Sequence, residues 1–383
     1  MKTLFRWLRW TALVLLLLVF ACLAATYSIV TPLFEAPDEP WHYLYVKHLA
    51  DGQGLPPLTY SDDPWVQGEN HQPPLYYLLG AVLSGWIDTA DLPAHLVRNP
   101  HAALGRADAF GNKNVVLHPP TGEWPYRGSV LAVHVVRLFS VLCGVVTVLA
   151  TYALGRELAP GSRWLGVGAA ALVAFNPQFL FISGAVNNDN LITALAALVL
   201  WGTVRVINQG SCSLRQACFL GLLTGLASLT KLSGLALMGL IGLGLALVAA
   251  RQRSWRALLG AGSLILGLVA LIAGWWYIRN AVLYADPLAV RAQALAFKGP
   301  GYAPAWPELL AMLKESVKSF WGVFGWMDTP LVIGKGRTDM VVRFAIQAAT
   351  WTFLALTLIR LEQVLSRLLR VARRGRWRGA LRI

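Results

Sequence analysis

Long apolar runs recur along the chain and are separated by shorter stretches rich in polar residues and proline. A run of about 20 apolar residues forms a helix long enough to cross roughly 30 Å of hydrocarbon. The pattern predicts about eight such helices, near residues 11–30, 130–154, 164–183, 191–207, 217–230, 232–250, 257–278 and 341–360. We therefore expect an all-α, polytopic membrane protein.

The composition supports this class. Hydrophobic residues make up 56% of the 383 positions, whereas about 45 to 50% of a soluble domain is apolar even with glycine counted. The first apolar run exceeds the roughly 7 to 15 residues of a signal-peptide core, so we expect a retained helix rather than a cleaved signal.

The placement of basic residues predicts the topology. Lys231 interrupts a long apolar stretch that Arg205 and Arg215 precede and that Arg251 and Arg253 follow. Cytoplasmic loops carry an excess of Lys and Arg, so both flanks belong in the cytoplasm and the stretch must form a hairpin with Lys231 at its outer turn.

The same rule places both termini in the cytoplasm, because Lys2 and Arg6 precede the first span and residues 361–383 form a basic tail. The formal net charge is +14. Its basic residues lie mainly at helix ends and in the tail, which favours contact with an anionic lipid surface over nucleic acid. We expect a multi-pass protein of the plasma (inner) membrane whose partners include the bilayer and no nucleic acid.

Most polar chemistry lies in one outer loop, residues 31–129, which holds eleven of the 19 acidic residues and six of the seven histidines. Within it, EPWHYLYVKHLADG has helical spacing typical of an interfacial helix. HQPPLYYLLGAVLSGWI, from His71 to Ile87, predicts a second apolar helix, short for a span. A second large outer loop, residues 279–340, contains an amphipathic segment from Pro307 to Asp328 that either lines a lipid entrance or anchors the surface.

Several motifs occur in an order that is informative. PDEPWHY follows the first span, HQPPLYYLL precedes the second, NPQFLFISGAVNNDN and GLLTGLASLTKLSG lie at outer turns, and RNAVLYADP and SFWGVFGWMD come later. This order, from about Pro32 to Asp328, resembles the GT-C class of integral-membrane glycosyltransferases, including protein O-mannosyltransferases and lipid A aminoarabinose transferases. From this resemblance we expect residues 1–360 to form one transmembrane glycosyltransferase module.

The resemblance implies transfer of a sugar from a polyprenyl-phosphate-linked donor to an acceptor hydroxyl at the outer membrane face. It makes Asp38 and Glu39 the catalytic acidic pair. A carboxylate there would take the proton of the attacking hydroxyl, while the phosphate leaves as a stable anion that needs cationic stabilisation. Lys231 and Arg279 are the implied phosphate contacts.

The remaining expected site residues are Asp189, as a second acidic group facing the donor or a metal, and His42, His71 and Tyr76, as substrate contacts. No cofactor or metal is expected. A divalent ion held by His71, His42 and Asp38 is an open alternative, although their spacing does not match a known metal motif.

Each assignment has a structural alternative. Asp38 and Glu39 could cap the helix that begins near Trp41, and Asp189 could cap the fourth span. Lys231 and Arg279 could simply reach toward the interface. For the whole chain, the other hypotheses are a transporter or flippase and a non-catalytic envelope assembly protein. The sequence leaves the acceptor open among a glycan, a lipid and a protein.

Overall fold

The structure is a computed structural model that describes residues 2–59, 65, 68–104, 111–162, 164–296 and 305–331. The chain divides into two compact units, Met1–Thr329 and Pro330–Ile383. The predicted span at 341–360 and the predicted basic tail at 361–383 lie outside the described residues.

The described part of the chain is almost entirely helical, as expected for an all-α membrane protein. Five of its helices are long and apolar enough to cross a membrane. They are α1 (Lys2–Val30), α5 (Gly128–Leu158), α8 (Asp189–Gln209), α10 (Ala236–Gln252) together with the short helix η3 (Leu232–Leu235) before it, and α11 (Arg256–Tyr284).

A sixth span is formed only if α6 (Leu165–Ala174) and α7 (Pro177–Ser183), which are bent by 66°, are counted together. The sequence predicts one continuous helix there. Asn176 ends that continuity, because its side chain accepts the backbone N–H of Phe179 at 2.9 Å and so caps a new helix that begins at Pro177.

The predicted count of eight spans is therefore not confirmed. The fifth predicted span is α9 (Leu214–Ser228), whose 15 residues fall short of a typical crossing. Ser213 and Gln216 form a reciprocal capping box at its start.

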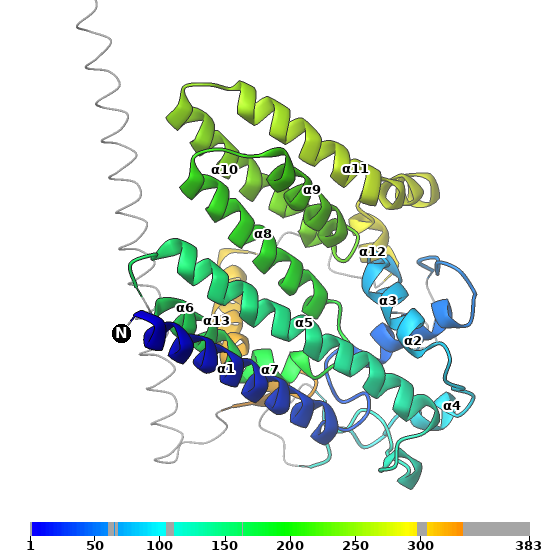
Figure 1. Cartoon of the computed structure of the whole chain (residues 1–383). Coiled ribbons are helices and arrows are strands. Elements are labelled where there is room, and N and C mark those ends of the chain that lie inside the picture. The colour runs from blue at the N-terminus through cyan, green and yellow to red at the C-terminus, as the bar shows by residue number, and fades with distance from the viewer. Residues whose placement is uncertain are drawn as a thin grey trace, which may run out of the picture. The chain divides into compact units, whose positions relative to one another are not determined.

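The hairpin around Lys231 is present. The chain reverses through η3, and α10 returns to the end of α8, where Arg251 donates to the Ile207 carbonyl at 2.8 Å and Gln252 to the Gly210 carbonyl at 2.6 Å. Helices α8 to α11 lie side by side in Figure 1 and share one apolar core that includes Val199 and Leu220.

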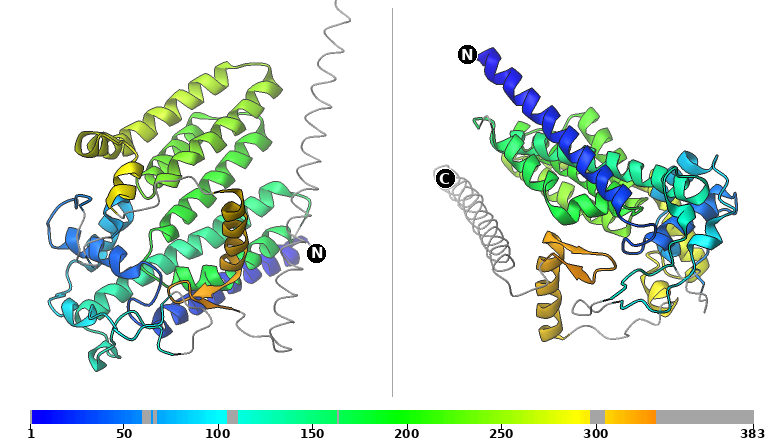
Figure 2. Two further views of the ribbon diagram at one scale, coloured as in Figure 1. Left: turned by 180° about the vertical axis from the view of Figure 1, so that it is seen from behind. Right: turned by 90° about the horizontal axis from the view of Figure 1, so that it is seen from below.

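A second core joins α1, α5, α6 and α7 around Phe20 and Val148. Figure 2 shows α1, in dark blue, running along this part of the bundle. The large side chains Leu15, Leu18, Leu266 and Leu271 on α1 and α11 are exposed. Such apolar outer faces are expected of a multi-pass protein in lipid.

The segment predicted as the first outer loop packs as a third core on the N-terminal part of α5, and the name is kept below for this segment. It contains both predicted helices, α2 (Glu39–Ala50) and α3 (Leu75–Ser84). Its other elements are η1 (Glu69–His71), α4 (Leu92–His95) and η2 (Pro120–Gly122).

After α11 come α12 (Val290–Ala296), α13 (Trp306–Trp321) and the paired strands β1 (Val323–Phe324) and β2 (Thr329–Pro330). The predicted amphipathic helix is α13. Leu313 and Phe320 are among its exposed apolar side chains.

Candidate active site

Lys231 and Asp189 form the ion pair from which the candidate site is built. The Lys231 Nζ lies 2.5 Å from Asp189 Oδ1, and the two side chains are 29% and 48% exposed. Asp189 is the first residue of α8, but its carboxylate does not cap the helix. The Asn187 amide oxygen accepts the Asp189 N–H at 2.8 Å, and the N-cap residue Asn188 makes no side-chain capping bond. Both charges therefore remain open to a third group.

The turn that carries Lys231 is held on three sides. The Leu229 carbonyl accepts the N–H of Leu75 on α3 at 2.9 Å, and the Ser228 carbonyl accepts the Tyr277 hydroxyl of α11 at 2.8 Å. Asn188, just before α8, donates to the Thr230 carbonyl at 3.2 Å.

Gly234 completes the positioning of this turn. A Cβ at that residue would lie 2.3 Å from the Ala227 carbonyl carbon, so only glycine lets η3 approach the last turn of α9 this closely. The ammonium group thus projects from a rigid turn.

A cavity of about 410 Å³ opens beside Lys231. Its walls come from the loop before α3, from η3, from α11 and from α12. Trp276 and Tyr277 supply aromatic surface, and His71, Gln72 and Ser233 supply polar groups. The lining combines one cation with apolar and polar side chains. Such a cavity suits a ligand that has an anionic group linked to an apolar chain or to a sugar.

Asp38 is exposed, and it lies near enough to this ion pair for the charges of Lys231 and Asp189 to act on its carboxyl. Its backbone has φ 59° and ψ 2°, in the left-handed region, and its side chain makes no capping bond to α2. No hydrogen bond or ion pair with another described residue engages the carboxylate. The capping alternative is therefore not what the geometry shows. A strained, unengaged carboxylate is a feature of functional sites.

The surroundings of Asp38 adjust its acidity. Partial burial raises the pKa of its carboxyl, and the negative charges of Glu69 and Asp189 add to the rise, whereas His42 and Lys231 oppose it. A carboxyl with a raised pKa is a better proton acceptor than an ordinary aspartate.

Glu39 is placed differently although it is the next residue. Its side chain is 0% exposed and pairs with that of Arg137, also 0% exposed. Arg137 donates through Nε and Nη2 to the two carboxylate oxygens at 2.7 and 2.6 Å. The backbone N–H groups of Phe34 and Val186 donate to the same carboxylate at 3.0 and 2.9 Å. These four bonds give the carboxylate of Glu39 a structural role, and its predicted role in catalysis stays a prediction.

Arg137 is a residue that the sequence analysis did not single out. Its guanidinium also donates to the carbonyls of Ser28, Thr31 and Pro32 at 2.7, 2.8 and 3.0 Å, and so ties the end of α1 to α5. The signal was present, because a lone cation inside a predicted span is costly in lipid unless it has a partner.

Glu35, the first carboxylate of the cluster, is also structural. It accepts the N–H groups of Val115 and Val116 at 2.8 and 3.2 Å and contacts His118 Nε2 at 3.0 Å. It thereby fastens a distant part of the first outer loop to the end of α1.

The three predicted substrate contacts differ in access. Tyr76 is fully buried, its hydroxyl bonded to Ser140 Oγ at 2.7 Å and to the Asn187 N–H at 3.0 Å. This position gives it a packing role. His42 is buried with Nδ1 2.9 Å from the Tyr77 hydroxyl, and burial lowers its pKa to about 4, so it is neutral at neutral pH. His71 lines the cavity, and burial lowers its pKa too.

Arg279 lies on α11 next to the cavity wall. Its guanidinium stacks 5.0 Å from the centre of the Trp276 ring and donates to the carbonyls of Leu55 and Pro56 at 3.3 and 3.1 Å. It joins the first outer loop to α11. Among the described residues, no group of three or more His, Cys, Asp and Glu side chains converges as ligands of a metal ion would.

Residues 118–277 match the family model described as dolichyl-phosphate-mannose-protein mannosyltransferase, over less than half of the 383-residue chain. The matched segment includes Asp189 and Lys231 and begins after Asp38. No curated protein matches this chain.

Solved structures show a distant likeness. The Pmt1–Pmt2 protein O-mannosyltransferase complex of S. cerevisiae, bound to the sugar donor, has 16% identity and a TM-score of 0.45 over 72% of this chain and 34% of that chain. The archaeal oligosaccharyltransferase AglB of Archaeoglobus fulgidus, with an inhibitory peptide and a dolichol-phosphate, has 17% identity and a TM-score of 0.45 over 90% and 37%.

This chain therefore spans little more than a third of the length of these two structures. The family match is the comparison that supports a membrane glycosyltransferase of the GT-C class, the class that the sequence motifs resemble.

Proposed function

We propose that this protein transfers a sugar from a polyprenyl-phosphate-linked donor to an acceptor hydroxyl at the outer face of the plasma (inner) membrane. The observation that carries the proposal is the unengaged carboxylate of Asp38, which lies within electrostatic range of the Lys231–Asp189 pair, together with the cavity that Lys231 lines. The family match supports the same class of donor, a sugar on a lipid phosphate.

The proposed reaction needs one proton acceptor and one cation. The oxygen of the acceptor hydroxyl attacks the anomeric carbon of the sugar while the Asp38 carboxylate takes the hydroxyl proton. The bond between the anomeric carbon and the phosphate oxygen breaks. The polyprenyl phosphate leaves with the bonding electron pair. Lys231 contacts the phosphate and stabilises its growing charge, which lowers the barrier without a general acid.

The other residues hold and shape the site. In this proposal Asp189 keeps Lys231 in position until the phosphate binds, His71 and Trp276 face the donor, and Arg279 adds positive charge near the cavity. Glu39 supports the turn that presents Asp38. The outer-face assignment is supported by the distribution of basic residues, which predicts that both termini lie in the cytoplasm.

The test is mass spectrometry of lipid-linked sugars and envelope glycans in a deletion strain. The strain is complemented with the wild-type protein or with Asp38→Asn at matched abundance. We expect a polyprenyl-phosphate sugar to accumulate and one glycosylated product to disappear in two strains, the deletion strain and the strain complemented with Asp38→Asn. The strain complemented with the wild-type protein should show neither change. Unchanged lipid-linked sugars and glycans in the deletion strain would reject a transferase and favour a non-catalytic role.

A further inference from the structure

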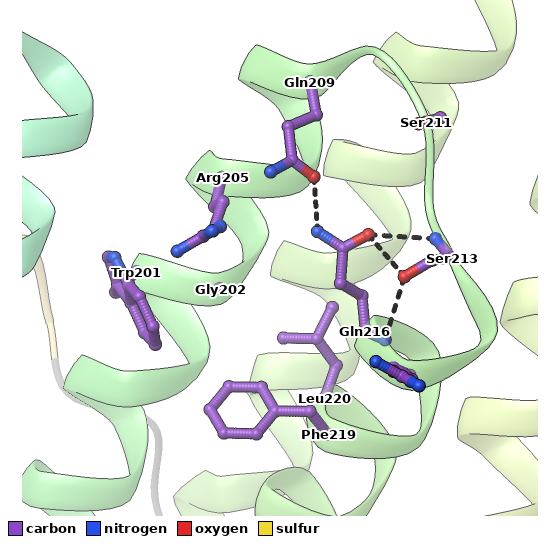
Figure 3. A pocket seen from close by; sticks show the side chains of 10 residues that line it. Trp201, Gly202, Arg205, Gln209, Ser211, Ser213, Gln216, Phe219 and Leu220 are labelled. Atoms are coloured by element: carbon purple, nitrogen blue, oxygen red, sulfur yellow. Dashed lines mark hydrogen bonds between the residues drawn. The ribbon is translucent and has the colours of Figure 1, made fainter. Parts of the chain in front are cut away.

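A second cavity, of about 450 Å³, lies between the end of α8 and the start of α9 (Figure 3). Asp189 begins α8, a helix of 21 residues, and this cavity lies along the last part of the helix, from Trp201 to Gln209. At 1.5 Å per residue these positions lie about 18 to 30 Å along the helix from Asp189, on the scale of a hydrocarbon core of roughly 30 Å. The cavity therefore lies at the opposite membrane face from the candidate active site.

The end of the cavity near the α8–α9 connection is cationic. Arg205 and Arg215 are among its ten lining residues, none of which is acidic. Arg205 meets Glu157 only at 3.8 Å on an exposed surface, a contact that contributes little. No ion pair joins Arg215 to another described residue. The cavity thus keeps two positive charges available for an anion.

A closed network of amides holds this cationic end in shape (Figure 3). Gln216 Nε2 donates to Gln209 Oε1 at 2.7 Å, and Gln216 Oε1 accepts both the N–H and the hydroxyl of Ser213 at 2.9 Å. The network fixes the start of α9, whose first backbone N–H groups have no partner within the helix and add partial positive charge.

The opposite end of the cavity, deeper along the two helices, is apolar. Trp201 and Phe219 meet edge to face with ring centres 6.1 Å apart, and Leu220 lies beside them. Gly202 lets Leu220 and Phe219 of α9 pack closely against α8 at this end, because a Cβ there would lie 3.0 Å from Leu220 Cδ2 and 3.3 Å from Phe219 Cε1. The Arg205 guanidinium lies 5.6 Å from the Trp201 ring centre, at the border between the polar and apolar ends.

We propose that this cavity binds the headgroup of an anionic phospholipid in the leaflet opposite the candidate active site. Arg205 and Arg215 contact the phosphate. Trp201 and Phe219 contact the glycerol and the first methylene groups. A free phosphate ion would leave the apolar end unfilled, and the quaternary ammonium of a neutral lipid would meet two arginines. Anionic headgroups beside Arg and Trp are the arrangement expected at a membrane surface.

The experiment uses the full chain, purified in a neutral detergent, and counts bound lipids by native mass spectrometry. The probes are short-chain phosphatidylglycerol, short-chain phosphatidylcholine and inorganic phosphate. The double variant Arg205→Gln/Arg215→Gln is compared with Arg253→Gln/Arg256→Gln. The second pair removes the same charge at the neighbouring end of α10 and start of α11, outside the cavity lining.

We expect phosphatidylglycerol to bind the wild type at least ten-fold more tightly than phosphatidylcholine. The cavity variant should lose about 30-fold in affinity for phosphatidylglycerol, since one cation near an anionic group is worth roughly five-fold. The matched control should retain its affinity. Equal losses in both double variants, or equal affinity for the two lipids, would overturn the proposal.

Phe219→Ala separates a lipid from a soluble anion. We expect it to weaken phosphatidylglycerol about ten-fold by removing apolar contact area, with binding of inorganic phosphate unchanged. If inorganic phosphate competes with phosphatidylglycerol at equal concentration and Phe219→Ala changes neither, the cavity binds a soluble anion and the lipid assignment is wrong. Circular dichroism and the elution volume of each variant establish that it is folded.

Discussion

Asp38 and Glu39 are adjacent residues of the same type of charge, yet they lie in opposite environments. Glu39 is buried against Arg137 and accepts four hydrogen bonds, whereas Asp38 is exposed and engaged by none of the described residues. A buried charge is tolerable only with complete pairing. A carboxylate that is to accept a proton must instead stay available. One short turn satisfies both requirements by pointing successive side chains apart.

The two ion pairs of the region repeat this contrast. Arg137–Glu39 is closed to solvent, and Lys231–Asp189 is open. We interpret the Arg137–Glu39 pair as the support of the turn that carries Asp38. In the Lys231–Asp189 pair, Lys231 would exchange Asp189 for the phosphate of the ligand.

The largest expected effect is that of Asp38→Asn on turnover. Asparagine keeps the size of the side chain but cannot take a proton, so turnover should fall by roughly 10² to 10⁴ in an assay that measures release of polyprenyl phosphate. Near wild-type turnover at matched protein abundance would remove Asp38 from the mechanism.

Thermal unfolding in detergent provides the control for Asp38→Asn. The pKa of Asp38 is raised in the folded state, so any stabilisation linked to it is present at low pH and lost as pH rises through that pKa. At neutral pH the ionised carboxylate is therefore less stable in the folded protein than in the unfolded chain. We expect Asp38→Asn to unfold no earlier than the wild type there.

Glu39→Gln tests the other half of the comparison. Removal of one partner leaves Arg137 buried and uncompensated, which typically costs about 3 to 5 kcal/mol in the free energy of unfolding. We expect a clear fall in the thermal midpoint. Arg137→Met should cost a similar amount. If Glu39→Gln unfolded like the wild type but lost turnover, Glu39 would be the catalytic carboxylate.

Asp189→Asn should change the free energy of unfolding by less than about 1 kcal/mol, because exposed ion pairs contribute little. The measurement is the same thermal unfolding, made beside Glu39→Gln. A loss as large as that of Glu39→Gln would show that the Lys231–Asp189 pair is structural, and the distinction between the two ion pairs would not hold.

The pH profile offers the smallest and most specific effect. As a base, Asp38 is active when deprotonated, so kcat/KM should fall with decreasing pH through a pKa above the ordinary aspartate value of about 3.9. Glu69 raises this pKa, so Glu69→Gln should move the acidic limb of the profile to lower pH. Movement in the opposite direction would assign the limb to another group.

The long apolar helices were predictable because their signal is local. Runs of hydrophobic residues identify α1, α5, α8 and α11, and the spacing around Trp41 identifies α2. The bend at Asn176 was also encoded, since Asn followed by Pro favours the start of a new helix. It was overlooked because the surrounding hydrophobicity is continuous.

The sequence predicts less well which charged side chains pair with one another. Arg137 and Glu39 are 98 positions apart in the sequence, and Lys231 and Asp189 are 42 apart. Residue type alone does not distinguish Asp38 from Glu39, because the difference arises from a left-handed backbone residue and from which helix each side chain meets. The order of the motifs indicates the region of the site, whereas the different packing of the two side chains distinguishes Asp38 from Glu39.

The most direct test of the central claim is binding of a polyprenyl phosphate to the purified protein and to Lys231→Met and Lys231→Arg. A hydrogen bond to a charged group is worth about 1.5 to 3 kcal/mol, so Lys231→Met should weaken binding by roughly 10- to 150-fold. Lys231→Arg should retain part of the affinity, because it keeps the charge but not the compact ammonium group. Equal affinity of the wild type and Lys231→Met would contradict a donor-phosphate site at this lysine.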